Sequence, residues 1–465
     1  MSDAPTPEQY TVVRGVPSEG RNRDAILAEL REMASGEDAY WETGRCSGTM
    51  YCGDHDHYAF MNEAFSMFSH ENVLQRDMFP SATRFEGEII AMTLDMLHAS
   101  AVVDGEAVGM VTSGGTGSIL HAMLAYREHA RTERGIAAPN VVKPETGHPA
   151  FDKACHLLGI ELRKVPVDPD TTRADLGAMA DAIDANTAAV IGSAPNYGYG
   201  TIDPIAELSD LALERGIGLH VDGCLGGFIL PWGEELGYGI PVFDFRLPGV
   251  TTISADTHKY AYGLKGTSVL AFRERALRDG QYFFLTDWTG GKYCSPGIDG
   301  SRSGGLLAAT WAGMMALGRD GYLKYARQIF ETAFAMQDAV RVYPELRIIG
   351  TPTFCFSFTS DAFDIYHVND FMRTKGWRFN GQQYPNAIHM AVTRPQTQPG
   401  LVDEFAADLG DAVAYAHEHR DEAPKSGAIY GGIPGGPTPE TDEFIRAVMT
   451  EMMDDQQSVP APMGD

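Results

Sequence analysis

The sequence predicts an α/β protein in which helices wrap a mostly parallel sheet. Between residues 85 and 325, segments with helical periodicity such as 85–97 alternate with short apolar runs such as 188–192 and 266–272. Strands that helices cover on both faces read as short, continuous apolar runs, and this alternation is typical of a parallel sheet. With 465 residues, 44% of them hydrophobic, the chain can bury a large core and is too long for one simple domain.

The remainder of the chain predicts two further parts. After a helix near residues 322–340, the apolar runs 353–358 and 387–392 indicate a smaller α+β domain. We therefore expect an N-terminal arm (residues 1–84), a large domain (85–325) and a small C-terminal domain (326–465). The polar, proline-bearing end 456–465 is expected to fray.

Charge and cysteine usage restrict the partners and the compartment. A formal charge of −27 and a pI near 4.8 argue against nucleic acid and anionic membranes as partners. The six cysteines are scattered without C-x-x-C or zinc-like spacing, which predicts reduced thiols in the cytoplasm. Residues 1–8 lack the basic and apolar regions of a signal peptide, and no run of about 18 apolar residues predicts a transmembrane segment.

The segment 254–260, Ser-Ala-Asp-Thr-His-Lys-Tyr, places Lys259 directly after His258 in a polar turn that follows an apolar strand. We interpret Lys259 as a lysine that forms a Schiff base with a carbonyl cofactor. An isolated lysine is more often a solvated surface charge. Three other elements favour the functional interpretation.

The first element is the strand 219–222, which ends in Asp222 and breaks into glycines. Open α/β sheets bind ligands at such strand ends. Pyridoxal 5′-phosphate (PLP) needs a carboxylate beside its pyridine nitrogen, because a protonated ring stabilises a carbanion on the substrate. Asp222 is the candidate, and the alternative is an aspartate that caps backbone amides.

The second element is the Gly-rich turn 111–118, followed by a predicted helix at 119–126. Gly115 and Thr116 would let backbone N–H groups approach the PLP phosphate at the helix N-terminus. The turn matches neither the P-loop nor the dinucleotide pattern. The third element is His148, ahead of a helix, whose imidazole could stack on a pyridine ring or could simply cap the helix.

These elements, in this order and together with further motifs, resemble those of the group II PLP-dependent decarboxylase superfamily. Within that superfamily the chain is most similar to the sphingosine-1-phosphate lyases of the soluble bacterial type. The similar motifs lie at residues 44–48 with Tyr51, 77–81, 112–116, 148–153, 220–222, 254–260, 286–291, 300–305, 375–377 and 427–431. The resemblance implies the type I fold of PLP-dependent transferases, with the arm contributing to the active site and the large domain binding PLP.

The resemblance also implies roles for individual residues at a PLP site. Lys259 would carry PLP, Asp222 would face the ring nitrogen and His148 would stack on the ring. Gly115, Thr116 and His258 would contact the cofactor near its phosphate. Ser301 and Arg302 lie in a loop that, in the family, comes from the second subunit, so a homodimer with shared active sites is expected.

The implied reaction is a retro-aldol cleavage of a phosphorylated β-hydroxy amine, such as a sphingoid base 1-phosphate, into an aldehyde and phosphoethanolamine. It needs a base near the hydroxyl and an acid near the carbanion. Tyr51 is the first choice for such a group and Tyr197 the second, although a buried tyrosine with one hydrogen bond is an equal alternative for Tyr197. Amino-acid decarboxylation and a catalytically silent PLP-binding protein are the competing interpretations.

The chain departs from the family at the expected substrate phosphate site. Asn72 is retained, but Gln75 stands where the family has histidine, so charge there would have to come from Arg76 turning inward. Lys265, the second phosphate ligand by match, is retained. Gly117 replaces the family's glutamate and Gly223 its alanine, which predicts more space near the cofactor and a substrate that differs from a long-chain sphingoid phosphate.

The cluster Asp54-His55-Asp56-His57 has no counterpart in the family pattern. Alternating aspartate and histidine could ligate a metal, but on a loop such side chains point in unlike directions. We favour a loop at the substrate entrance over a metal site, and expect no metal. His121 and His389 are interpreted as packing or surface histidines.

Overall fold

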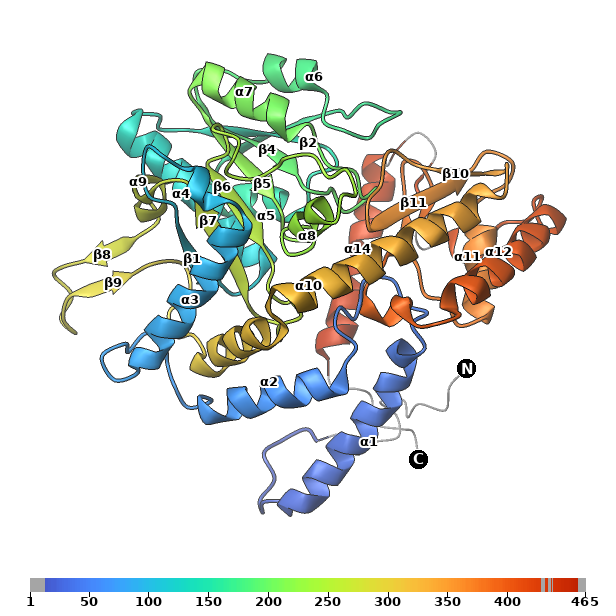
Figure 1. The fold of residues 1–465 in the computed structure, drawn as a ribbon, viewed down its shortest axis with the longest axis horizontal. Helices are drawn as coiled ribbons and strands as arrows, with labels where there is room; N and C mark the ends of the chain where they lie inside the picture. Colours follow the sequence, from blue (N-terminus) through green and yellow to red (C-terminus); the bar gives the residue numbers. More distant parts are fainter. Residues whose placement is uncertain (1–12, 428–430, 434–435, 437, 459–465) are drawn as a thin grey trace.

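A seven-stranded mixed sheet lies at the centre of the computed structural model, which describes residues 13–427, 431–433, 436 and 438–458 (Figure 1). Across the sheet the strands are β1 (Val108–Thr112), β7 (Ser268–Phe272), β6 (Thr252–Ala255), β5 (Gly218–Asp222), β4 (Thr187–Ser193), β2 (Asn140–Pro144) and β3 (Glu161–Val165). From β3 to β6 neighbouring strands run parallel, whereas β7 is antiparallel to both β6 and β1. The predicted mostly parallel sheet is confirmed, with β7 as the reversed strand.

Helices cover both faces of this sheet. Every residue of β2, β4, β6 and β7 is buried, and successive residues of a strand face opposite sides. The short apolar runs of the sequence are the consequence. The covering helices are α3 (Pro80–Met96), α4 (Gly115–Glu133), α5 (Ala150–Leu158), α6 (Leu176–Asp181), α7 (Ile205–Arg215), α8 (Leu230–Glu235) and α9 (Arg275–Asp279), with the short 3-10 helix η2 (Ala99–Ala101) after α3.

A second, four-stranded sheet follows later in the chain. All its neighbouring strands are antiparallel, in the order β10 (Leu346–Ile348), β11 (Cys355–Ser360), β13 (Ala387–Ala391) and β12 (Asn380–Gln382). The helices of this region are α11 (Tyr366–Thr374), η3 (Arg394–Thr397) and α12 (Leu401–Glu418). The α+β elements predicted after the long helix are therefore present.

The long helix α10 (Gly304–Arg341) runs diagonally between the two sheets (Figure 1). Ser303 caps its start by accepting a hydrogen bond from the Leu306 N–H, and Gly318, with φ of 56°, bends it in the middle. The predicted boundaries at residues 84 and 325 fall inside α3 and α10, so the division into an arm and two domains stays a proposal.

The N-terminal arm contains α1 (Arg23–Glu42) and α2 (His55–Met67), and α2 packs along α10. Between them, backbone hydrogen bonds fasten residues 45–48 to the second sheet region. The Ser47 N–H donates to the Arg378 carbonyl at 2.9 Å and the Gly48 N–H to the Ala391 carbonyl at 3.1 Å. Because this attachment lies three residues before Tyr51, it positions the backbone that carries Tyr51.

Two elements lie apart from these layers. The hairpin of β8 (Phe283–Leu285) and β9 (Tyr293–Ser295) projects from the side of the sheet, and α14 (Pro439–Gln457) follows α12 (Figure 1). The sequence predicts fraying of residues 456–465, but α14 continues through Gln457, so this expectation is wrong for residues 456 and 457. Residues 1–8, 428–430 of the motif 427–431, and 459–465 lie outside the described residues. Among the helices that are described, none has the length and apolarity needed to cross a bilayer.

Candidate active site

A cavity of about 450 Å³ opens at the carboxyl ends of β1, β5 and β6, where open α/β sheets bind ligands. It brings together five of the predicted site residues from three separate segments. Those residues are Gly115, Thr116, His148, His258 and Lys259, and Asp256 and Cys224 complete the wall beside them.

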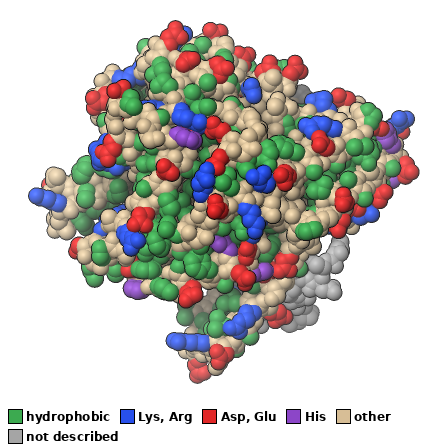
Figure 2. All heavy atoms as spheres, in the orientation of Figure 1, with side chains coloured by type: hydrophobic (Ala, Val, Ile, Leu, Met, Phe, Trp, Pro, Cys, Tyr) green, Lys and Arg blue, Asp and Glu red, His purple; other side chains and the backbone are tan. Residues whose placement is uncertain are grey.

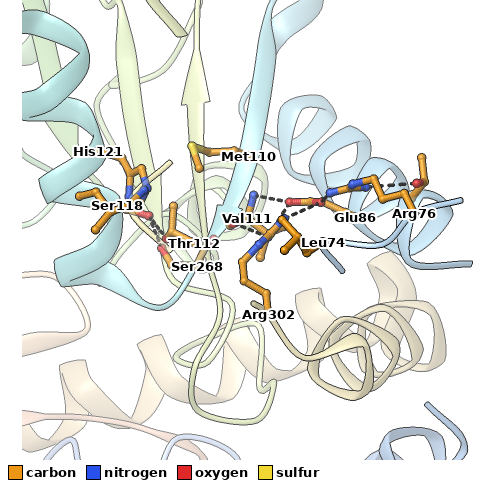
Figure 3. A network of polar contacts seen from close by, with 12 residues as sticks. Leu74, Arg76, Glu86, Met110, Val111, Thr112, Ser118, His121, Ser268 and Arg302 are labelled. Atoms are coloured by element: carbon orange, nitrogen blue, oxygen red, sulfur yellow. Dashed lines mark hydrogen bonds and ion pairs between the residues drawn. The ribbon is translucent and has the colours of Figure 1, made fainter. Parts of the chain in front are cut away.

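The Gly-rich turn between β1 and α4 forms one wall of the cavity. Gly114 has φ of +131°, a conformation that side chains disfavour, and it stands at the N-cap, where it has no side chain to cover the N–H groups of the first turn. The Ser118 hydroxyl braces this turn, because it lies 2.7 Å from the Thr112 hydroxyl and 2.9 Å from the Ser268 hydroxyl (Figure 3). These exposed N–H donors suit a phosphate group.

Lys259 lies opposite this turn, with its Nζ 3.0 Å from Asp256 Oδ2. Burial lowers the pKa of Lys259, but the Asp256 carboxylate, with further contributions from Tyr51 and Cys224, outweighs it and holds that pKa well above the ordinary range. Asp256 is 2% exposed, and its Oδ1 has no hydrogen-bond partner among the described residues. A Cβ on Gly115 would come within 2.6 Å of Asp256 Oδ2, so only glycine lets the turn and this carboxylate approach so closely.

His148 lines the cavity, whereas Asp222 does not line it but is hydrogen-bonded to Cys224, which does. Asp222 is buried, and its Oδ1 accepts hydrogen bonds from the Cys224 N–H at 3.1 Å and the Ser254 hydroxyl at 3.4 Å. His148 lines the cavity while its Nδ1 accepts a hydrogen bond from the Ala150 N–H at 3.1 Å, at the start of α5. Each residue thus makes the local contact of the simpler interpretation, and their roles toward a cofactor stay predictions.

Two tyrosines predicted for proton transfer come close to Lys259. Tyr51 packs edge-on against Tyr260, with 5.2 Å between ring centroids, and Lys265 Nζ lies 4.7 Å from the Tyr51 ring. Burial raises the pKa of Tyr51, which the Lys259 charge partly offsets. Tyr197 accepts a hydrogen bond from Asn380 Nδ2 at 2.9 Å, and partial burial raises its pKa to about 12. Both phenols therefore carry their proton at neutral pH.

The predicted residues on segments 72–76 and 301–302 do not line the cavity at Lys259. Ser301 and Arg302 line a second cavity of about 290 Å³, and Asn72 Nδ2 donates to the Ser301 hydroxyl at 3.0 Å. Gln75 is exposed. Arg76 lines a third cavity and pairs with Glu86 rather than turning toward Lys259.

Glu86, on α3, joins the two arginines (Figure 3). Its carboxylate is 6% exposed and accepts from Arg302 Nη1 at 2.9 Å, from Arg302 Nη2 at 3.1 Å and from Arg76. Arg302 Nη1 also donates to the Val111 carbonyl at 2.9 Å. Burial raises the pKa of Glu86, but the two guanidinium groups outweigh it and lower that pKa below its ordinary value.

The expected widening at two glycines is wrong. A Cβ on Gly117 would lie 2.8 Å from Ser113 Oγ, and a Cβ on Gly223 would lie 2.8 Å from the Ser254 carbonyl oxygen. Neighbouring atoms already occupy the room that a side chain would need. These substitutions therefore let the backbone pack closely and do not open space near a cofactor.

The cluster at residues 54–57 begins a helix instead of forming a loop. Asp54 caps α2 through the His57 N–H and pairs with Arg394 at 3.0 Å. His57 Nε2 faces the Tyr262 carbonyl at 3.3 Å, whereas His55 pairs with Glu42 at 2.9 Å. The side chains diverge, and the cavity of about 600 Å³ that Asp54 and His55 line has none of its lining residues in common with the cavity at Lys259.

The donors of the first cavity suit PLP. The exposed N–H groups of α4 match its phosphate and Lys259 matches its aldehyde. The carboxylate of Asp222, which is hydrogen-bonded to the N–H of the lining residue Cys224, matches its ring nitrogen. The sequence interpretation missed Asp256 and Glu86. Asp256 had a visible signal, since an acid three positions before a lysine can pair with it in a turn, whereas Glu86 reads as one more charge on an amphipathic helix.

Comparisons with known proteins identify similar sequences and structures. A family profile described as the pyridoxal-dependent decarboxylase conserved domain matches residues 12–358. The sphingosine-1-phosphate lyase of Dictyostelium discoideum is 41% identical over 95% of this chain and 81% of its own length, and that of Arabidopsis thaliana is 44% identical over 86% and 75%. The solved structure of a Burkholderia pseudomallei sphingosine-1-phosphate lyase is 56% identical, with a TM-score of 0.91 over 97% of this chain and 99% of that one. A glutamate decarboxylase of Lactobacillus brevis, 19% identical with a TM-score of 0.73, shares the fold.

Proposed function

We propose that this chain, which belongs to the pyridoxal-dependent decarboxylase family and within it to the sphingosine-1-phosphate lyases, cleaves a phosphorylated β-hydroxy amine into an aldehyde and phosphoethanolamine. It is a PLP-dependent lyase, and its substrate is a small molecule. The observation that carries the proposal is the cavity that joins Lys259 and the Gly-rich turn, with Tyr51 and Lys265 beside it. Amino-acid decarboxylation is not better supported.

The side chains have complementary roles in this reaction. Bound PLP supplies an electron sink for the bond that breaks. Lys259 holds or releases a proton at Nζ, and Asp256 stabilises its charged form. Tyr51 and Tyr197 carry their protons at neutral pH, so they are suited to donate a proton or a hydrogen bond to a substrate oxygen or carbon.

Lys265 is the cation best placed to bind the substrate phosphate. Its ammonium group lies 4.7 Å from the centre of the Tyr51 ring. Burial lowers the pKa of Lys265, and Lys259 is near enough for its charge to lower that pKa further. Arg76 is already paired with Glu86, which also binds Arg302, so its guanidinium group is engaged in an ion pair and does not face Lys259. Phosphate recognition by Asn72, Gln75 and Arg76 would require these residues to face the site of a second subunit.

We expect the active unit to be a homodimer. Apolar side chains are exposed beside the segments that carry Asn72 and Arg302, and Figure 2 shows hydrophobic side chains gathered over α2 and α3 among scattered charges. The exposed residues are Phe60, Met67, Leu74, Met78, Phe283, Phe284 and Trp288, between 44% and 66% accessible. Covering them in an isologous interface would bring Ser301 and Arg302 to a partner's cavity. All six cysteines are free thiols, which supports the expected cytoplasmic location.

The test is an assay of the purified protein with PLP, with products identified by mass spectrometry. Sphingosine 1-phosphate should yield a long-chain aldehyde and phosphoethanolamine, and the Lys259→Ala variant should yield neither. A phosphorylated short β-hydroxy amine tests the tail length. Release of carbon dioxide from amino acids, with no aldehyde from either phosphorylated amine, would refute the proposal.

A further inference from the structure

The segment 296–302 connects the β8–β9 hairpin to α10 and carries the two residues expected to close over a cofactor, Ser301 and Arg302. It is fastened to the rest of the chain at two points. Near its end, Arg302 is held by Glu86 and by the Val111 carbonyl, as described above. Near its beginning, the Ile298 N–H donates to His121 Nε2 at 2.9 Å.

His121 lies on the first turns of α4, beyond the Gly-rich turn, and it is 1% exposed. Its Nδ1 lies 2.6 Å from the Gly117 carbonyl oxygen. A carbonyl oxygen only accepts, so Nδ1 must carry the hydrogen, and an amide N–H only donates, so Nε2 must be bare. The two partners therefore fix one neutral tautomer of the imidazole. The interpretation of His121 as a mere packing histidine is incomplete.

The close approach at this contact is permitted by a glycine. A Cβ on Gly297 would lie 2.4 Å from His121 Nε2 and 3.2 Å from Met110 Cε. Any side chain at residue 297 would push the segment away from the imidazole. The contact thus depends on residues from two distant parts of the chain.

We propose that His121 is a positioning residue, which fastens the segment 296–302 to the first turn of α4 so that the phosphate turn and the loop carrying Ser301 and Arg302 are held as one unit (Figure 3). The expected effect on PLP retention rests on the proposed PLP site. The contact between His121 and Ile298 does not depend on catalysis. It gives a role to a histidine that lies outside the lining of the cavity.

Protonation of His121 would break this contact. A second N–H on the ring would face the Ile298 N–H, and two donors cannot share a hydrogen bond. Burial lowers the pKa of His121, the Gly117 carbonyl and the Asp299 carboxylate raise it, and the Arg302 guanidinium lowers it. The net pKa lies below the ordinary value of 6.5, so the segment is held at neutral pH and released in acid.

Amide hydrogen exchange at Ile298 in the full-length apoprotein tests the contact, with rates corrected for the intrinsic effect of pH. The wild type should protect this amide at about pH 8 and lose the protection only at a pH below the ordinary imidazole value of 6.5. His121→Gln should keep the protection throughout this pH range, because glutamine Oε1 accepts without titrating. His121→Phe and Gly297→Ala should reduce protection at pH 8 by about three- to tenfold, the effect of one net hydrogen bond. His156→Gln, at an exposed histidine of α5, is the matched control and should behave as the wild type.

PLP release from the same proteins tests the coupling. His121→Phe and Gly297→Ala should release PLP faster than the wild type by a similar factor, followed by the loss of cofactor absorbance after dilution. Gly297→Ala leaves His121 in place, so its PLP release tests the proposal even if His121→Phe fails to fold. Wild-type protection at Ile298 in both His121→Phe and Gly297→Ala, or unchanged PLP release in both, would overturn the proposal, whatever substrate the enzyme cleaves.

Discussion

The Asp256 carboxylate can stabilise charged Lys259 through its negative charge and through a hydrogen bond. Replacing Asp256 by asparagine should separate these two effects. Asparagine keeps the shape and a hydrogen-bonding oxygen at 3.0 Å but removes the negative charge. The lost charge-assisted contact is worth about 1.5–3 kcal/mol. Because burial opposes the charged form of Lys259, the neutral fraction of its amine near pH 7.5 should rise by about ten- to a hundredfold.

Two measurements check this expectation. Only a neutral amine attacks an aldehyde, so the rate at which apoprotein becomes covalently labelled by PLP, trapped with borohydride, should rise at pH 7.5 by a comparable factor. The free energy of unfolding of the apoprotein should fall by about 1.5–3 kcal/mol. A raised folded-state pKa contributes stability below the ordinary lysine pKa and loses it as pH rises through the folded value, so the deficit should be constant between about pH 6 and 9.

The control is Glu106→Gln, which removes a carboxylate from an exposed ion pair with Arg275. Solvent screens that pair, so neither measurement should change beyond its error. If Asp256→Asn leaves both the labelling rate and the unfolding free energy at the wild-type values, then Asp256 does not hold the charge of Lys259, and the pairing at 3.0 Å has no energetic significance.

The other predictions concern the cofactor lysine, the shared site and the phosphate contact. Lys259→Ala should abolish PLP labelling after borohydride reduction, and a labelled peptide that maps to another lysine would show the assignment to be wrong. Mixing Lys259→Ala chains with Arg302→Ala chains should restore part of the activity through one hybrid site, whereas no recovery in proven heterodimers would count against a shared site. Lys265→Met should lower kcat/KM by about ten- to a hundredfold for a phosphorylated substrate and little for its non-phosphorylated analogue, and equal losses would refute the phosphate contact. Arg76→Ala should affect both substrates alike because Arg76 is engaged in an ion pair with Glu86, and a loss confined to the phosphorylated one would mean that Arg76 turns inward.

The parts of the fold and site that could be predicted are those encoded by short stretches of sequence. Periodicity located β4, β7 and α3 because strands and helices covered by neighbours must be apolar at fixed spacings. The Gly-rich turn and the turn at Lys259 each follow a strand directly, so their place at one edge of the sheet follows from the parallel order.

The parts that could not be predicted depend on contacts between distant segments. Glu86 meets Arg302 across 216 positions, and no local pattern marks either as the partner of the other. The attachment of Ser47 to Arg378 likewise joins the arm to a region far along the chain. The helix α14 was also missed, because all its described side chains are exposed or half-buried and its apolar residues are mixed with acids.

These long-range contacts change how the departure at Gln75 should be understood. From the sequence, the missing histidine charge seemed to need replacement by Arg76, but Arg76 and Arg302 share the single carboxylate of Glu86. Asn72 is bound to Ser301, so the segment at residues 72–76 and the loop at 301–302 are held together at both ends. In a dimer the two segments would reach a partner's cavity as one piece, and their geometry would depend on Glu86 more than on Gln75. Lys265, with its Nζ 4.7 Å from the centre of the Tyr51 ring, is then the cation that we propose for the substrate phosphate.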